Sequence, residues 1–505
     1  MKILGISAGF HDAAAAVIST GGVIKFAAHS ERYSRVKNDP WLNHDLIGEA
    51  LEHGRPDTIV LHESHRLKQL RNLRHANWSA LREPSQREWI RKFYPELRGI
   101  PIKERLHHES HAMAGVMTSG YSEATVVVID AIGEFNTGTI WHWRDSKLTR
   151  KHQVNFPNSL GVFYSAVTQY VDLKPMEDEY ILMGMAAYGH PTGSQELAKQ
   201  LKRRFFREQD ITKHPQRALN TVNLQRGIRD LDMNGYTEFD LARAAQIVVE
   251  ERIYAYCEYA KQLTGCDRLV YQGGVALNCV ANTLLQDIYS DIWIMPNPGD
   301  AGSALGAAAA EYNDRLSRDY QLIWCGPYLG TEIPGAYPVE RALESLRQGE
   351  IFGIANGRAE YGPRALGNRS LLADPRGGDI KDRVNAIKRR QEFRPFAPVI
   401  LEEHVHEYFD VPPGTQIPYM QYTPRCLTPR QTPAIVHADG TSRVQTVNRD
   451  QHPDLYELLT RWHSESGCPM LLNTSLNIKG QPIVNTVTDA QEFAAHYGVK
   501  VHTHD

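Results

Sequence analysis

Two histidines four residues apart are the first side chains whose spacing suggests chemistry. His107 and His111 lie in a stretch with helical periodicity, so both imidazoles would stand on one face of a helix, within a turn of each other. Two carboxylates at the mouths of predicted strands or turns, Asp130 and Asp300, would complete a set of two imidazoles and two carboxylates. This mixture of donors suits Fe(II), Mn(II) or Zn(II) better than a metal that selects thiolates. The spacing alone leaves open a plain polar pair on a helix surface.

A second group of candidate residues is rich in arginine. The segment 361–370 joins a turn-forming Gly-Pro to two arginines five residues apart, Arg364 and Arg369. Because the planar guanidinium binds carboxylate or phosphate through paired hydrogen bonds, arginines held by Gly and Pro turns predict a polyphosphate-binding site. A solvated basic face is the alternative. The cations downstream that belong to this group are Lys388, Arg389, Arg390, Arg394 and Arg443.

The predicted elements begin with two strand–turn–strand units. Residues 2–7 and 13–19 are predicted strands joined by a short turn, and residues 125–130 and 137–143 form a similar pair. Turns of this kind cluster backbone N–H groups, which attract anions. Paired units that hold nucleotide phosphates in this way are typical of the actin and sugar-kinase type of fold, and two unrelated hairpins are the alternative.

Glycine-rich turns follow two later predicted elements. The strand 267–271 runs into Gly273, Gly274 and Asn278, which predicts a strand, a glycine turn and a helix. The segment 299–306 places Asp300 at the start of an alanine-rich helix, whose small side chains allow close packing. Helical periodicity also predicts helices over 105–115, 160–171 and 241–263.

The length and composition indicate a folded protein of several domains. The chain has 505 residues, of which 42% are hydrophobic and 23% charged, with a formal net charge of −3. Glycines and prolines interrupt all periodicity over 325–338, so we predict one domain over 1–332 and a second over 333–505. The second domain is predicted to begin with a helix over 339–348 and a strand over 351–355, and to end after a strand over 470–472. The fold class is α/β.

Several classes of protein are not expected. No stretch reaches the roughly 18 consecutive apolar residues of a membrane-spanning helix. The N-terminus lacks the apolar core of a signal peptide, and the six cysteines form no C-x-x-C pair. We therefore expect a cytoplasmic protein without a membrane partner, a zinc ribbon or a disulfide framework.

Six motifs in this order resemble the O-carbamoyltransferases of the nodulation-factor, cephamycin and tobramycin type. They are Gly9-Phe10-His11-Asp12-Ala13-Ala14, His107-His108-Glu109-Ser110-His111-Ala112, and the segments 273–281, 361–370, 393–398 and 473–477. The resemblance covers nearly the whole chain. It implies an actin-like N-terminal domain and a smaller α/β C-terminal domain similar to threonylcarbamoyl-adenylate synthases.

The resemblance also implies a two-step reaction and a role for each matched residue. In such enzymes the C-terminal domain makes O-carbamoyl-adenylate from carbamoyl phosphate and ATP with Mg²⁺, and the N-terminal domain passes the carbamoyl group to a hydroxyl. His107, His111, Asp130 and Asp300 would hold Fe(II), with Mn(II) or Zn(II) as the other choices, and His11, beside Asp12, would be the base. The residues implied to bind carbamoyl phosphate and nucleotide are Arg364, Arg394, Arg443, Asn473, Ser475, Lys388, Gly273, Gly274 and Asn278.

Two further positions bear on nucleotide binding in the N-terminal domain. Lys37 falls where the family often has a lysine near the nucleotide, and we expect a catalytic role for it. Ile181 replaces a lysine that family members often carry before the Met-Gly-Leu-Ala motif. One nucleotide contact in the N-terminal domain is therefore expected to be missing or to come from another residue.

The acceptor is the open question, and charge patterning gives one indication. Residues 65–99 contain nine Lys or Arg and three Asp or Glu, and residues 199–229 contain nine and two, with aromatic residues in both. Such stretches are typical of nucleic-acid contacts, so a hydroxymethylated base in DNA is one hypothesis, and solvated helices are the alternative. A sugar or antibiotic acceptor, a tRNA threonylcarbamoyl-type transferase, a non-catalytic nucleotide-binding scaffold and a homodimer also stay open.

Overall fold

The computed structural model describes the whole chain except residues 75–77, 79–83, 207–230 and 316–321. It consists of two compact units. Unit 1 comprises Met1–Ser30 and Asn38–Trp324, and unit 2 comprises Cys325–Asp505 together with the short segment Glu31–Lys37. The chain therefore leaves unit 1 for seven residues near its start.

Unit 1 contains two five-stranded sheets with the same strand order. In each sheet the first strand pairs antiparallel with the second and parallel with the fourth, and the second and third form a hairpin. This repeated order confirms the α/β class and the actin-like duplication, and both predicted hairpins are present. The strands are β1 (Ile3–Ser7), β2 (Ala14–Ile18), β3 (Ile24–His29), β4 (Thr58–Leu61) and β5 (Ile102–Glu104), then β6 (Glu123–Ile129), β7 (Asn136–Arg144), β8 (Lys147–Asn155), β9 (Arg268–Gln272) and β10 (Asp291–Trp293).

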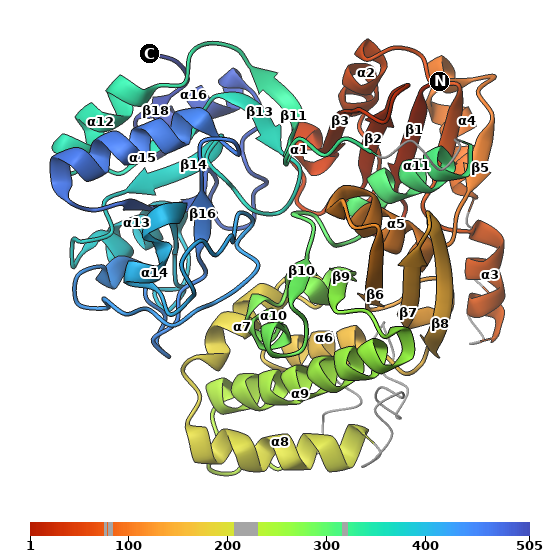
Figure 1. The fold of residues 1–505 in the computed structure, drawn as a ribbon, viewed down its shortest axis with the longest axis horizontal. Helices are drawn as coiled ribbons and strands as arrows, with labels where there is room; N and C mark the ends of the chain where they lie inside the picture. The colour runs from red at the N-terminus through yellow and green to blue at the C-terminus, as the bar shows by residue number, and fades with distance from the viewer. Residues whose placement is uncertain (75–77, 79–83, 207–230, 316–321) are drawn as a thin grey trace. The chain divides into compact units, whose positions relative to one another are not determined.

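Two helices pack against each other between these sheets. Helix α11 (Gly302–Arg315) covers β1, β2 and β4, and helix α5 (His107–Ser119) covers β6 and β9 (Figure 1). Small residues allow this close packing. A Cβ atom added at Gly306 would lie 1.7 Å from the carbonyl oxygen of Ser110, and one added at Gly5 would lie 1.9 Å from that of Ala304. The layers therefore fix the positions of the first turns of α5 and α11.

The remaining helices of unit 1 surround the sheets. Helix α9 (Glu238–Thr264) is the longest of the described helices and begins with a capping box in which Thr237 and Asp240 bond each other's backbone N–H groups. It ends at Gly265, whose φ of +69° suits the left-handed C-terminal position. These helices are α2 (His44–Glu52), α3 (His65–Arg74), α4 (Gln86–Phe93), α6 (Leu160–Tyr170), α7 (Glu179–Ala186), α8 (Pro191–Phe205), α9 (Glu238–Thr264) and α10 (Cys279–Leu284).

Unit 2 is built on a six-stranded mixed sheet and a separate two-stranded sheet. Leucine-rich faces of two of its helices, with Trp462, pack on the sheet and form its core. The strands are β11 (Tyr328–Ile333), β12 (Phe352–Ala355), β13 (Gly357–Glu360), β14 (Arg369–Ala373), β15 (Ala397–Leu401), β16 (Gln445–Val447), β17 (Met470–Ser475) and β18 (Val501–His502). The helices are α1 (Glu31–Ser34), α12 (Val339–Arg347), α13 (Ile380–Lys388), α14 (Val405–Tyr408), α15 (Pro453–Ser466) and α16 (Val487–Tyr497).

Among the described residues, no helix combines the length and the apolar character that crossing a membrane requires.

Candidate functional site

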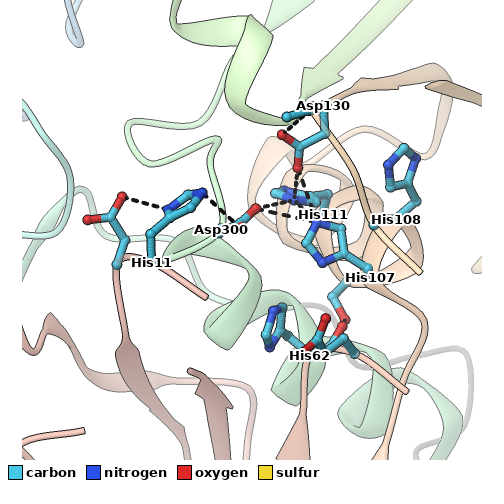
Figure 2. Close-up of polar contacts among 12 residues, drawn as sticks. His11, His62, His107, His108, His111, Asp130 and Asp300 are labelled. Carbon is cyan, nitrogen blue, oxygen red and sulfur yellow. Dashed lines mark hydrogen bonds and ion pairs between the residues drawn. The ribbon is translucent and has the colours of Figure 1, made fainter. Parts of the chain in front are cut away.

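Four buried side chains of unit 1 form what we call the imidazole–carboxylate cluster: His107, His111, Asp130 and Asp300. The histidines stand one turn apart on α5, Asp130 follows β6, and Asp300 precedes α11. Figure 2 shows the four side chains converging. Three elements that are distant in sequence therefore place their ends at one point.

The distances in this cluster suit a single cation. The Nε2 atoms of His107 and His111 are 3.1 Å apart, and each lies 3.1 Å from Asp130 Oδ2. Asp300 Oδ1 is 3.3 Å from His107 Nε2 and 3.2 Å from His111 Nε2. Tetrahedral ligands with such separations stand about 2 Å from their common centre, which is the usual metal–nitrogen or metal–oxygen distance. The donor set therefore fits a divalent transition-metal ion.

Contacts behind the ligands hold them in place. His111 directs Nδ1 at the carbonyl oxygen of Pro298, 3.0 Å away, so that its Nε2 faces the cluster. Asp130 Oδ1 accepts a bond from the backbone N–H of Ala131, which leaves Oδ2 for the imidazoles. Glu134 accepts a bond from the backbone N–H of His107 at the start of α5. These contacts are typical of preorganised metal ligands.

The electrostatics of the cluster favour positive charge. Burial alone would lower the pKa of both histidines and raise that of both aspartates. Because each imidazole faces two carboxylates, the pKa values of His107 and His111 are nevertheless raised, and those of Asp130 and Asp300 are lowered. A cation can take the place of the protons that this arrangement attracts.

His11 lies at the edge of the cluster and is partly accessible. Its Nε2 is 3.6 Å from Asp300 Oδ2, and its Nδ1 is 3.2 Å from Asp12 Oδ2 (Figure 2). About a quarter of the His11 side chain is exposed. Burial lowers the pKa of His11, but the charge of Asp300 and the hydrogen bond that His11 donates to Asp12 outweigh this effect and raise the pKa to about 9. The predicted base thus adjoins the predicted metal ligands.

The glycine turn after β9 passes directly beside Asp130. Gly273 has a φ of +94°, and a Cβ atom there would lie 2.2 Å from the carbonyl oxygen of Ile129. A Cβ atom at Gly274 would lie 3.1 Å from Asp130 Oδ1. Asn278 exchanges two hydrogen bonds with Gln246, each 3.0 Å long. The glycines therefore allow the chain to approach the cluster, and the Asn278 amide holds α9 to this turn.

Unit 2 holds a second polar site, which we call the lysine cluster: Lys388, Ser475 and Asn477. Lys388 is buried at the end of α13, and its Nζ lies 3.2 Å from Ser475 Oγ and 2.9 Å from Asn477 Oδ1. Its other acceptors are backbone carbonyls. Burial, together with the charges of Arg390 and Arg394, holds the pKa of Lys388 well below its ordinary value. A buried ammonium without a carboxylate among these acceptors is suited to an anionic ligand.

The other predicted residues of unit 2 occupy different environments. Asn473 is buried, donates to Gln445 Oε1 at 2.7 Å, and keeps its own side-chain oxygen without a hydrogen-bond partner in the described structure. Arg364, Arg394 and Arg443 are half-buried. Arg369 is fully buried and donates to backbone carbonyl oxygens, which include those of Asn356 and Asn485. Arg369 therefore supports the fold and does not face a phosphate. The sequence had placed Arg369 in the predicted polyphosphate-binding site.

Lys37 and Ile181 each have contacts within their own part of the fold. Lys37 belongs to the segment that packs with unit 2, and its Nζ lies 2.8 Å from Glu31 Oε2. Ile181 is buried in α7, where its side chain contributes to the core. His62, Glu63 and Glu134 also lie near the imidazole–carboxylate cluster, and no sequence motif predicted them. The available sequence signal for His62 and Glu63 was their position directly after the short apolar segment 58–61, which forms β4.

Family models identify both halves of the chain. The model described as Carbamoyltransferase N-terminus matches residues 91–309, and the model described as Carbamoyltransferase C-terminus matches residues 343–503. The chain belongs to the carbamoyltransferase family. The predicted resemblance is confirmed, and this carbamoyltransferase is accordingly a transferase.

Relatives of this carbamoyltransferase align over most of its length. It is 35% identical to nodulation protein NolO of Bradyrhizobium diazoefficiens, over 76% of this chain and 75% of that protein. It is 32% identical to an uncharacterized Synechocystis protein, over 97% of this chain and 93% of that protein. It is 28% identical to the 3'-hydroxymethylcephem-O-carbamoyltransferase of Amycolatopsis lactamdurans, over 97% and 95% respectively.

Proposed function

We propose that this carbamoyltransferase is an ATP-dependent O-carbamoyltransferase whose two units carry different half-reactions. Unit 2 uses carbamoyl phosphate, ATP with Mg²⁺ and water to make O-carbamoyl-adenylate, with release of phosphate and pyrophosphate. Unit 1 then transfers the carbamoyl group to an acceptor hydroxyl and releases AMP. The observation that carries the proposal is that each family-matched unit holds its own buried cluster, one suited to a cation and one to an anion.

In unit 2 the proposed ligands of the phosphates and the carbamoyl group are the lysine cluster and its neighbours. An anion bound beside Lys388 would stabilise its charged form, which burial disfavours, and the side-chain oxygen of Asn473 is available to accept a hydrogen bond from a carbamoyl N–H. Arg364, Arg394 and Arg443 would neutralise phosphate oxygens through paired hydrogen bonds. Charge on the leaving pyrophosphate is the main barrier in adenylate formation, so these cations would act chiefly by electrostatic stabilisation.

In unit 1 the proposed metal ligands are His107, His111, Asp130 and Asp300. An Fe(II), Mn(II) or Zn(II) ion held there would act as a Lewis acid on oxygen. An ion bound to Asp300 would offset the charge that raises the pKa of His11, so that the neutral imidazole could take the proton of the acceptor hydroxyl at Nε2 while Asp12 holds its Nδ1. Gly274, whose added Cβ would meet only Asp130 Oδ1 within 4 Å, would leave room beside Asp130 for the adenylate. Lys37 is proposed to assist nucleotide binding.

The acceptor is proposed to be a hydroxymethylated base in DNA. The described part of the basic stretch 65–99 supports this proposal, because helix α4 exposes Arg91, Lys92 and Phe93. Trp89 of the same helix lies 5.1 Å, between ring centroids, from Trp41, which is half exposed. Cations beside exposed rings suit a polynucleotide. Most of the second basic stretch, 199–229, lies outside the described residues.

Two measurements test the reaction. Pyrophosphate release should require both ATP and carbamoyl phosphate, and mass spectrometry should find one carbamoyl group added to a competent acceptor. The panel comprises hydroxymethylcytosine DNA, unmodified DNA, aminoglycosides and sugars. Pyrophosphate release with threonine and bicarbonate, and none with carbamoyl phosphate, would indicate a threonylcarbamoyl-type enzyme. Carbamoylation of a sugar or aminoglycoside alone would refute the DNA acceptor and leave the reaction standing.

A further inference from the structure

A second group of metal-binding side chains adjoins the imidazole–carboxylate cluster. His62 and Glu63 directly follow β4, and with His107 they bring three possible ligand atoms within 4.8 Å of one another. All three side chains are buried. The carbamoyl-transfer mechanism proposed above gives His62 and Glu63 no role. Their chemistry therefore needs a separate explanation.

Two ring nitrogens in this group lack hydrogen-bond partners. The Nδ1 atoms of His62 and His107 are both buried and unpaired in the described structure. His107 uses Nε2 toward Asp130 and Asp300, so Nδ1 is its remaining donor. Figure 2 shows His62 on the side of His107 that faces away from Asp130, and the two ring centroids are 5.3 Å apart. Because an unpaired buried polar atom is unfavourable, these two nitrogens are expected to share a bound species.

Glu63 supplies the charge that this bound species would meet. Its Oε1 is 2.6 Å from Lys68 Nζ and 3.1 Å from Gln86 Nε2. Neither contact involves Oε2. The charge of Lys68 helps to hold the pKa of Glu63 below its ordinary value, although burial opposes this effect. Lys68 and Gln86 therefore fix the carboxylate through one oxygen and leave the other to coordinate.

We propose that His62, Glu63 and His107 bind a second divalent transition-metal ion, with His107 shared between two ions. Two imidazoles and one carboxylate form the ligand set that zinc and non-haem iron use when they keep open positions. His62 and His107 would bind through Nδ1 and Glu63 through Oε2. A neutral imidazole carries one N–H proton, so an ion at each nitrogen of His107 makes it a bridging imidazolate and releases that proton to solvent.

Charge does not forbid this arrangement. Asp130 and Asp300 balance a divalent ion in the first cluster. Around the second ion, the charges of Glu63, the bridging imidazolate and nearby Glu134 offset the ion and Lys68. Glu134 lies close enough to accept bonds from the backbone N–H groups of Ser64 and His107, 2.9 and 3.0 Å away.

Metal content of the full-length protein tests the proposal. The protein is stripped with a chelator, loaded with Zn²⁺ or Co²⁺, freed of excess metal and analysed by mass spectrometry. We expect two equivalents per chain in the wild type, and one in His62→Ala and in Glu63→Gln. His142→Ala is the matched control, because His142 pairs with Glu123 on a neighbouring strand of the same unit, and it should retain two. One equivalent in the wild type and in both variants overturns the second site.

The same experiment separates this inference from the proposed function. If His111→Ala binds one metal equivalent fewer than the wild type, and His62→Ala binds as much metal as the wild type, the result supports only the first cluster. Absence of bound metal in the wild type refutes both metal sites. With Co²⁺, we expect magnetic coupling between the two ions across the shared imidazolate in the wild type and no coupling in Glu63→Gln. This variant keeps the shape of the side chain, so it can serve if His62→Ala fails to fold. Two uncoupled cobalt ions in the wild type would contradict sharing of His107.

Discussion

Asp300 uses its two carboxylate oxygens for different neighbours. Oδ1 lies 3.2–3.3 Å from the two imidazoles of the cluster, and Oδ2 lies 3.6 Å from His11 Nε2. A single side chain thus connects the predicted metal ligands with the predicted base. The charge of Asp300 is also one of the main causes of the raised pKa values of His11 and His107. Removal of this one charge should therefore affect both parts of the site.

Asp300→Asn keeps the shape of the side chain and removes its charge. We expect the affinity for the ion at the first cluster to fall by more than about 100-fold, because a lost ligand costs more than a lost outer contact. Competition with a chromogenic chelator measures the affinity. Asp287→Asn, at an exposed position that precedes β10, is the control and should bind like the wild type. Equal affinities in both variants would exclude Asp300 as a ligand.

His11→Asn tests the role of the base. Loss of a general base typically costs about 10²–10⁴-fold, so carbamoyl transfer to the acceptor should fall by that factor. Pyrophosphate release from ATP and carbamoyl phosphate should stay within about twofold of wild type, since the proposed adenylate site lies in unit 2. The two rates are measured on the same sample by acceptor mass spectrometry and pyrophosphate detection. A parallel loss of both rates would assign His11 to another step.

At the scale of elements, helices α5 and α11 position the cluster through their close contact. His107 and His111 lie in the first two turns of α5, and Asp300 lies two residues before the start of α11. The contact between the helices depends on residues without bulky side chains. Any change that separates the two helices should move His107 and His111 away from Asp300. Stability and metal binding should therefore be lost together.

Gly306→Ala and Gly48→Ala form a matched pair of helical substitutions. The added Cβ at 306 would meet the Ser110 carbonyl oxygen at 1.7 Å, whereas the one at 48 meets nothing within 4 Å. We expect Gly306→Ala to lower the midpoint of thermal unfolding by several degrees and to weaken metal binding. Gly48→Ala should be neutral or raise the midpoint slightly, since alanine favours helix by roughly 0.5–1 kcal/mol. Similar midpoints for both variants would show that the helices do not need this contact.

Glu311 anchors the other end of α11. Its buried carboxylate pairs with Lys103, Arg105 and Arg315, which lower its pKa from the ordinary value of 4.5 although burial opposes them. A lowered pKa contributes stability above pH 4.5, and this stability is lost as the pH falls through the folded-state value. Glu311→Gln should therefore lower the thermal midpoint by several degrees at pH 7, and the difference should narrow below pH 4.5. A difference independent of pH would contradict this origin.

The sequence predicted elements better than their long-range contacts. Alternating and helical periodicities located both hairpins, α5, α6, α9 and β9, because those signals are local. The helical spacing of His107 and His111 placed them on one face of α5, where both are buried in the cluster. Three other features depend on tertiary packing. They are the assignment of Glu31–Lys37 to unit 2, the structural role of Arg369, and the approach of His62 to His107. Periodicity carries no information about such contacts.

At the scale of the whole molecule, the two units carry clusters of opposite preference. The imidazole–carboxylate cluster of unit 1 concentrates negative charge, and the lysine cluster of unit 2 concentrates positive charge. Under the proposed function, a substitution in one cluster should therefore remove one half-reaction and leave the other.

Lys388→Met tests this division in the full-length protein. The variant removes the buried ammonium and retains a long apolar chain, so unit 2 should fold while pyrophosphate exchange into ATP falls by at least about 100-fold, because several charge-assisted contacts are lost together. Its metal content should equal that of the wild type. His111→Ala should show the reverse pattern, with exchange retained and metal lost from the first cluster. Because the two substitutions lie in different units, loss of both pyrophosphate exchange and metal binding in either variant would mean that the units do not divide the reaction.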